Sequence, residues 1–189
     1  KSDDFKISAT GIIYRQTLEN STLTVKGTMK DPTTGKEVPG TFAWLNKYDR
    51  PINTGDVYFD WTFTPAEGYE EYAAVTDIVK VPVAPKSIEG ATITLEKYEF
   101  QYNAAEQSPK ITGVTLEDWD ETRITYIIKR GGSATDVSDS ITLTIEGTGN
   151  YTGTATVEWK ITPKTVTPTM EVAFCTYTGD ALEPAVTLE

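Results

Sequence analysis

Apolar and polar residues alternate along several stretches of the chain. Val57, Phe59, Trp61 and Phe63 share one parity, and Tyr, Asp and Thr occupy the positions between them. The same alternation recurs over three further ranges, 75–83, 141–146 and 154–161. Because successive side chains of a strand point to opposite faces, this pattern predicts strands with one buried and one solvated face. A slip of one residue would expose the apolar face, so we expect a well-determined register.

Turn signals separate these predicted strands. Segments rich in Gly, Asn, Asp and Pro occur at 31–35, 53–56, 131–132 and 147–150, and such residues mark turns. No stretch shows convincing 3.6-residue apolar spacing, and the best helical candidate, 67–74, is short and contains Gly68. The pattern therefore predicts an all-β protein.

The C-terminal half of the chain contains an internal repeat. Pro85-Lys86 begins one copy, and Pro163-Lys164 begins another 78 positions later. Other matching positions are Tyr102 with Tyr177 and Pro109 with Pro184, each pair 75 apart, and the sequence Val-Thr-Leu-Glu at 114–117 and 186–189. These spacings predict a module at 5–83, a second at 85–163, and the opening strands of a truncated third repeat at 164–189. Each predicted junction places a Pro directly after a strand, where its fixed φ limits bending.

Composition excludes several kinds of chemistry. The chain has no His and a single Cys, Cys175, which excludes a Ser-His-Asp triad, a Cys-His pair, a His-ligated metal and a Cys-rich zinc site. Carboxylate pairs are abundant, but nothing in the sequence selects one pair as the two acids of a glycosidase. We therefore expect no enzyme activity.

Charge and hydropathy narrow the expected partners. The net charge is −11, with 17 basic and 28 acidic residues, and Lys and Arg do not cluster, so nucleic acid and anionic membranes are poor partners. No apolar run approaches the roughly 18 residues of a transmembrane helix, so we expect no membrane insertion by this segment. The opening residues, Lys1 to Asp4, are polar and do not resemble a signal peptide.

The densest acidic cluster is the candidate ligand site. Asp118, Trp119, Asp120 and Glu121 are consecutive. Their carboxylates are weak candidates for Ca²⁺ ligands, with Asp136 or Asp139 assisting, and an exposed Trp119 would stack on a sugar ring or a partner. The favoured interpretations are plainer: a solvated hairpin turn for the acids and packing against its own sheet for Trp119. We expect no obligatory cofactor.

Several motifs resemble the bacterial immunoglobulin-like repeats of Gram-positive (Firmicutes) cell-surface proteins. They are 147–155 followed by Trp159-Lys160-Ile161, then 177–180 with Pro184, and in the first module 14–18, 39–44 and 63–65. The resemblance implies tandem, small antiparallel β-sandwich modules of immunoglobulin-like type. The Cys-Trp-Cys core of antibody domains is absent, which leaves a β-grasp-like fold as the alternative.

The resemblance also implies a role. We expect a non-catalytic, extracellular spacer or adhesion segment of a larger protein at the cell surface or cell wall, whose partners are neighbouring repeats. A carbohydrate- or host-protein-binding module and a calcium-stabilised adhesin are the alternatives. Lys86 and Asn150 are residue types that cross-link in some Gram-positive surface domains. For Asn150 we favour a turn role, because it and Gly149 tolerate positive φ.

Overall fold

The computed structural model describes residues 5–116, 123–170, 179 and 186–188. Within these ranges the regular elements are β-strands and one short 3-10 helix, and no α-helix is present, which confirms the all-β prediction. The helical candidate 67–74 forms turns instead, held by backbone bonds from Tyr69 N–H to the Ala66 carbonyl and from Tyr72 N–H to the Tyr69 carbonyl.

The first β unit comprises strands β1 to β6. Their bounds are β1 (Lys6–Ala9), β2 (Ile12–Ile13), β3 (Leu23–Lys26), β4 (Gly40–Trp44), β5 (Gly55–Pro65) and β6 (Val75–Ala84), with the 3-10 helix η1 (Leu18–Asn20) between β2 and β3. Strands β1 and β3 form a two-stranded antiparallel sheet. The other four form a sheet in the order β2-β6-β5-β4, in which only the β2–β6 pair is parallel.

The second β unit comprises strands β7 to β14. Their bounds are β7 (Lys86–Ser87), β8 (Thr92–Leu95), β9 (Glu99–Gln101), β10 (Ile111–Thr115), β11 (Tyr126–Arg130), β12 (Ser138–Gly147), β13 (Tyr151–Thr152) and β14 (Thr154–Thr162). Strands β8 and β10 form an antiparallel pair, and the larger sheet has the order β9-β14-β12-β11 with β9 and β14 parallel. Strands β7 and β13 form a further, parallel pair.

The two units share one strand topology. β1 pairs antiparallel with β3, as β8 does with β10. β2 lies parallel to β6, as β9 does to β14. Strand β15 (Pro168–Met170) pairs antiparallel with β16 (Val186–Leu188), as β8 pairs with β10. Both pairs set Thr opposite Thr, Thr115 with Thr92 and Thr187 with Thr169. The predicted ranges 5–83, 85–163 and 164–189 stay predictions, because strand pairing does not show which segments fold alone.

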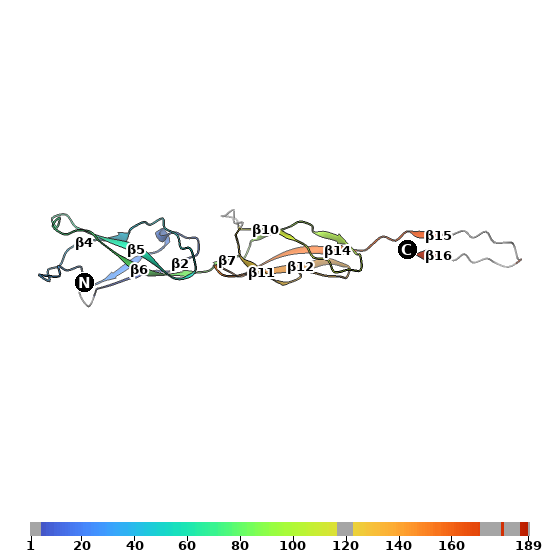
Figure 1. The fold of residues 1–189 in the computed structure, drawn as a ribbon, viewed down its shortest axis with the longest axis horizontal. Coiled ribbons are helices and arrows are strands. Elements are labelled where there is room, and N and C mark those ends of the chain that lie inside the picture. The colour runs from blue at the N-terminus through green and yellow to red at the C-terminus, as the bar shows by residue number, and fades with distance from the viewer. Residues whose placement is uncertain (1–4, 117–122, 171–178, 180–185, 189) are drawn as a thin grey trace.

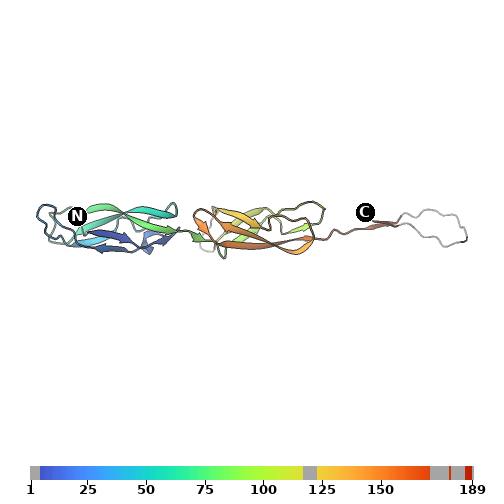
Figure 2. The same ribbon diagram turned by 90° about the horizontal axis from the view of Figure 1, so that it is seen from below.

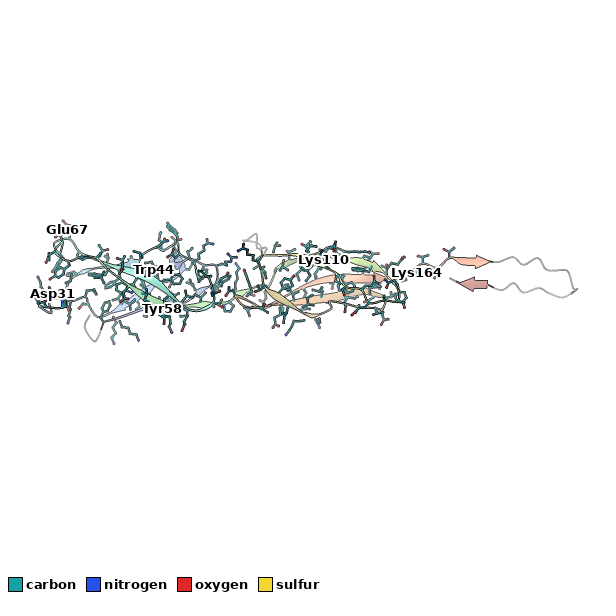
Figure 3. The ribbon with its side chains drawn as sticks, in the orientation of Figure 1. Asp31, Trp44, Tyr58, Glu67, Lys110 and Lys164 are labelled. Carbon is teal, nitrogen blue, oxygen red and sulfur yellow. The ribbon has the colours of Figure 1, made fainter. Side chains whose placement is uncertain are left out.

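The units lie end to end. Figures 1 and 2 show the first unit, the second unit and the β15–β16 pair following one another along the long axis. The chain passes from β6 to β7 through a single residue, Pro85. Figure 3 labels Asp31 and Glu67 at the outer end of the first unit and Lys164 at the far end of the second.

Each unit has its own apolar core, to which its antiparallel strand pair and its four-stranded sheet both contribute side chains. In the second unit, fully buried Leu143, Ile145 and Ile161 from the larger sheet meet Ile93 and Leu95 of β8. In the first unit, the corresponding core contains the buried apolar residues Ile12, Leu18, Val38, Trp61, Phe63, Val79, Val81 and Val83. The buried positions follow the alternation seen in the sequence. Burial of each large apolar side chain stabilises the fold by roughly 1.5–3 kcal/mol.

Three tryptophans among the described residues belong to the two cores. Trp61 and Trp159 are 1% and 2% exposed, and half-buried Trp44 packs against the first core. Trp44 Nε1 donates to the Ser21 carbonyl at 3.0 Å, and Trp159 Nε1 donates to the Gly131 carbonyl at 2.8 Å. Each of these two indoles therefore fills apolar space and satisfies its one donor.

Residues 85–163 produced alone should unfold in one cooperative transition, because every buried member of the second core comes from this range. Leu143→Ala should lower the free energy of unfolding of this fragment by about 2–5 kcal/mol, through lost burial and the cavity left behind. Urea denaturation followed by circular dichroism measures both quantities.

Thr156→Val is the matched control for this experiment, since Thr156 is exposed on β14 and Val keeps the β-branched shape. Its effect should stay within about 0.5 kcal/mol. A fragment that is unfolded or molten would contradict the predicted boundaries.

Candidate functional site: the joint between the two β units

The acidic cluster proposed from the sequence lies outside the described residues. This holds for Asp118, Trp119, Asp120 and Glu121 alike. Their predicted helpers, Asp136 and Asp139, are exposed. Among the residues that the structure describes, no group of three or more His, Cys, Asp or Glu side chains has an arrangement suited to a metal ion. The calcium and sugar-stacking hypotheses for this cluster stay predictions.

The best-defined arrangement of polar and aromatic groups is the joint between the units. The residue before Pro85 is tied to the first unit, because the Ala84 carbonyl accepts a hydrogen bond from Tyr14 N–H at 2.8 Å. The residue after it is tied to the second unit, because Lys86 N–H donates to the Asn150 carbonyl at 3.0 Å. Since the Pro ring fixes φ at this position, little backbone freedom remains between the two anchors.

Tyr14 is shared by both cores. Its side chain packs against the buried clusters of the first and the second unit. Its ring meets that of Tyr151 edge to face, with centroids 5.6 Å apart and an interplanar angle of 83°. Tyr151 is only 4% exposed. An aromatic pair of this geometry contributes about 0.5–1.5 kcal/mol beyond its buried area, so the contact holds the units against each other.

The Asn150 carboxamide forms the polar part of the joint. Its Oδ1 accepts a hydrogen bond from Thr54 N–H at 2.9 Å, and its Nδ2 donates to the Ile52 carbonyl at 3.3 Å. Residues 52–54 belong to the loop between β4 and β5, so this side chain connects positions almost 100 residues apart in the chain. A carboxamide offers one acceptor and two donors; a carboxylate would retain the acceptor and lose the donors.

A tight hairpin turn positions this carboxamide. Gly149 has a φ of 65°, Tyr151 N–H donates to the Thr148 carbonyl, and Thr148 N–H donates to the Thr125 carbonyl. Asn150 lies in the turn, as expected, but it does not itself have positive φ. Glycine supplies that conformation at 149, and Asn150 uses its side chain across the joint instead.

A cleft of about 430 Å³ opens beside the joint. Its lining residues come from both units and are Ile13, Tyr14, Arg15, Gln16, Thr17, Asn20, Arg50, Lys86 and Ser87. All three charged side chains among them are cationic, in a chain whose net charge is −11. Arg15 has a φ of 80°, which is costly for a residue with a side chain, and its guanidinium carbon lies 5.3 Å from the centre of the Tyr14 ring.

Sequence reasoning predicted a proline-containing junction at Pro85 but not the side-chain contacts across it. Tyr14 and Asn150 were assigned to motifs and turns within their own units, and nothing in the sequence indicates that Asn150 contacts residues 52–54. The structure shows that Tyr14 is equivalent to Tyr102: both follow a short parallel strand, and both donate to the carbonyl before a proline.

Comparisons of the chain with protein-family models, curated proteins and solved structures found no match. Within the described part of the chain, no helix has the length and apolar character needed to cross a membrane. The joint therefore has to be interpreted from its own geometry.

Asn150→Ala should loosen the joint without unfolding either unit, because it removes both side-chain hydrogen bonds and leaves a residue that tolerates this backbone. A hydrogen bond of this kind contributes about 0.5–1.5 kcal/mol, so exchange of the Thr54 amide hydrogen should accelerate by about two- to tenfold. Amide hydrogen exchange measured by NMR reports this residue directly.

The matched control is Asn53→Ala, which removes from the same loop an exposed carboxamide that makes no side-chain hydrogen bond to the other described residues. It should leave Thr54 exchange near the wild-type rate. Equal acceleration by both variants would contradict the assigned role of Asn150.

Proposed function

We propose that this chain is a non-catalytic spacer segment of a larger bacterial surface protein, in which tandem immunoglobulin-like β modules hold other domains at a distance. The joint carries the proposal. A flexible tether between modules needs no contacts beyond the linker, whereas here one Pro, a shared Tyr and a bridging Asn all restrict the same connection. Such a joint transmits orientation from one module to the next.

The arrangement of the chain supports this role. Figure 1 shows β7, where the chain enters the second unit, at the end opposite to the one from which it continues to β15, so this unit adds its full length to the assembly. The acidic composition favours solubility and keeps neighbouring copies apart. Extracellular location and attachment to a cell wall belong to the same proposal and follow from the resemblance of the repeat motifs.

Residual dipolar couplings provide the test. The two units of the intact chain should share one alignment tensor, because the joint leaves little room for reorientation. Inserting Gly-Ser-Gly between Ala84 and Pro85 should give each unit its own tensor, since the anchors on either side of Pro85 are then separated by a flexible linker.

The inserted chain is also the internal control, because its units should keep their native chemical shifts away from the joint. Independent tensors in the unmodified chain would overturn the stiff-spacer proposal.

The cationic cleft favours one second candidate, a module that binds an anionic ligand such as an acidic sugar or an acidic peptide of a host protein. Pockets between structural units are common ligand sites, and Arg pairs well with carboxylate and sulfate groups. The sequence-based candidate, Trp119, lies elsewhere in the chain, so a glycan array separates the two hypotheses.

Under the anion hypothesis, Lys86→Gln should weaken any array signal by about five- to thirtyfold, the cost of one charge-assisted bond being roughly 1–2 kcal/mol. Trp119→Ala should leave that signal unchanged. A binding signal that is lost with Trp119→Ala and kept with Lys86→Gln would contradict the anion-binding hypothesis for the cleft. An array with no binding signal supports the spacer hypothesis.

A further inference from the structure

The second unit ends in the same way as the first. Tyr102 follows β9 and donates its N–H to the Thr162 carbonyl at 2.9 Å, as Tyr14 follows β2 and donates to the Ala84 carbonyl at 2.8 Å. Both acceptor residues precede a proline. Tyr102 packs half-buried against the second core. It therefore occupies, at the outer end of the second unit, the place that Tyr14 occupies at the joint.

Strand register identifies the groups that correspond to the Asn150-binding loop. At the end of the first unit Gly55 pairs with Val83, and at the end of the second Ser138 pairs with Ile161. Thr54 directly precedes Gly55, and Val137 directly precedes Ser138. Counted from the pairing at the end of each unit, the Val137 N–H and the Thr135 carbonyl correspond to the two groups that bind the Asn150 carboxamide, although β12 has one extra residue between Ser138 and Ile141.

The loop that carries these groups is anchored. Gln107 and Ala134 exchange both backbone hydrogen bonds, at 2.9 and 3.0 Å. In the first unit the equivalent anchor consists of Leu18 N–H to the Asp49 carbonyl and Glu19 N–H to the Lys47 carbonyl. A loop held in this way presents its donor and acceptor without a large ordering cost on binding.

The two backbone groups are hydrogen-bonded in the first unit but not in the second. In the first unit Asn150 satisfies the Thr54 N–H and the Ile52 carbonyl. Among the described residues, none accepts a hydrogen bond from Val137 N–H or donates one to the Thr135 carbonyl, and the Val137 side chain is 45% exposed. The second unit therefore presents, toward the end where Lys164 lies (Figure 3), a donor and an acceptor that correspond to those with which the first unit holds its neighbour.

We propose that this surface, formed by Tyr102, Thr135 and Val137, is the docking site for a following β unit of the same topology. The following unit would insert the carboxamide of a Gly-Asn-Tyr hairpin between the Val137 N–H and the Thr135 carbonyl, and its Tyr ring would pack on Tyr102. The β15–β16 pair supports this occupant, because it repeats the first antiparallel pair of each preceding unit directly beyond this end (Figure 2). The inference rests on the spacer function proposed above.

The test uses the full chain with residues 85–162 present twice in tandem, so that the added copy supplies a Gly-Asn-Tyr hairpin to the second unit. The exchange rate of the Val137 amide hydrogen is compared between this chain and the unmodified chain by NMR. Docking should slow Val137 exchange by on the order of tenfold, the effect of one hydrogen bond of about 1.4 kcal/mol. Because the added copy has the sequence of the second unit, its own core signals report whether it is folded.

Two Asn→Ala substitutions test the joint between the first and second units and the joint between the second and added units independently. The substitution at the Asn150 equivalent of the added copy should restore fast exchange at Val137 and leave Thr54 protected. The substitution at Asn150 itself should release Thr54 and leave Val137 protected. As a second measurement, Tyr102→Ala should separate the alignment tensors of the second and added units, whereas Tyr102→Phe should keep them common.

The outcomes are distinguishable from those of the spacer test. Fast exchange at Val137 together with a protected Thr54 would overturn the docking site and leave the first joint intact. Independent tensors for the first two units of the unmodified chain would overturn the spacer proposal itself.

Discussion

The architecture depends on how the chain passes from one buried core to the next. Two strands separated by one proline cannot bend far, but they can still twist, and twisting is opposed by contacts away from the axis of the chain. The edge-to-face pair of Tyr14 with Tyr151 supplies one such contact, and the carboxamide bridge of Asn150 supplies a second. Together with Pro85 they restrain the connection at three separated points, which is enough to define an orientation.

The bridge is well suited to a boundary between two sheets. The end of a strand leaves backbone N–H and C=O groups without ladder partners, and residues 52–54 lie where β5 begins. A carboxamide has the same donor and acceptor pairing as a peptide group, so Asn150 extends the hydrogen bonding of one unit using a side chain of the other. The contact therefore satisfies groups that would otherwise depend on water.

Much of the fold was predictable from the sequence. Alternation identified the strands that carry Trp61, Phe63, Leu143 and Ile161, and these side chains are buried as expected, because two-residue periodicity is a direct consequence of strand geometry. The pairing of strands was harder to predict from the sequence. The parallel association of β2 with β6 and of β9 with β14 depends on contacts between segments about 60 to 70 residues apart, for which short-range patterns contain no signal.

The joint was not predictable from the same patterns. Asn150 lies in a Gly-rich hairpin, where a turn role is the ordinary explanation for Asn, and its partners are backbone groups whose residue identity carries no information. Tyr14 looked like a repeat motif residue because its second contact, Tyr151, lies in the next unit. To predict contacts across the boundary between two units, one must know which ends of the units meet. Only the three-dimensional arrangement shows this.

The position of Tyr14 between two cores has a thermodynamic consequence. A side chain that helps to bury both hydrophobic interiors makes the folding of one module favour the folding of its neighbour, as in a one-dimensional chain with nearest-neighbour coupling. Modules linked in this way gain stability from being internal to a row, and the terminal members are the first to open. Fraying would then begin at the tips and proceed inward.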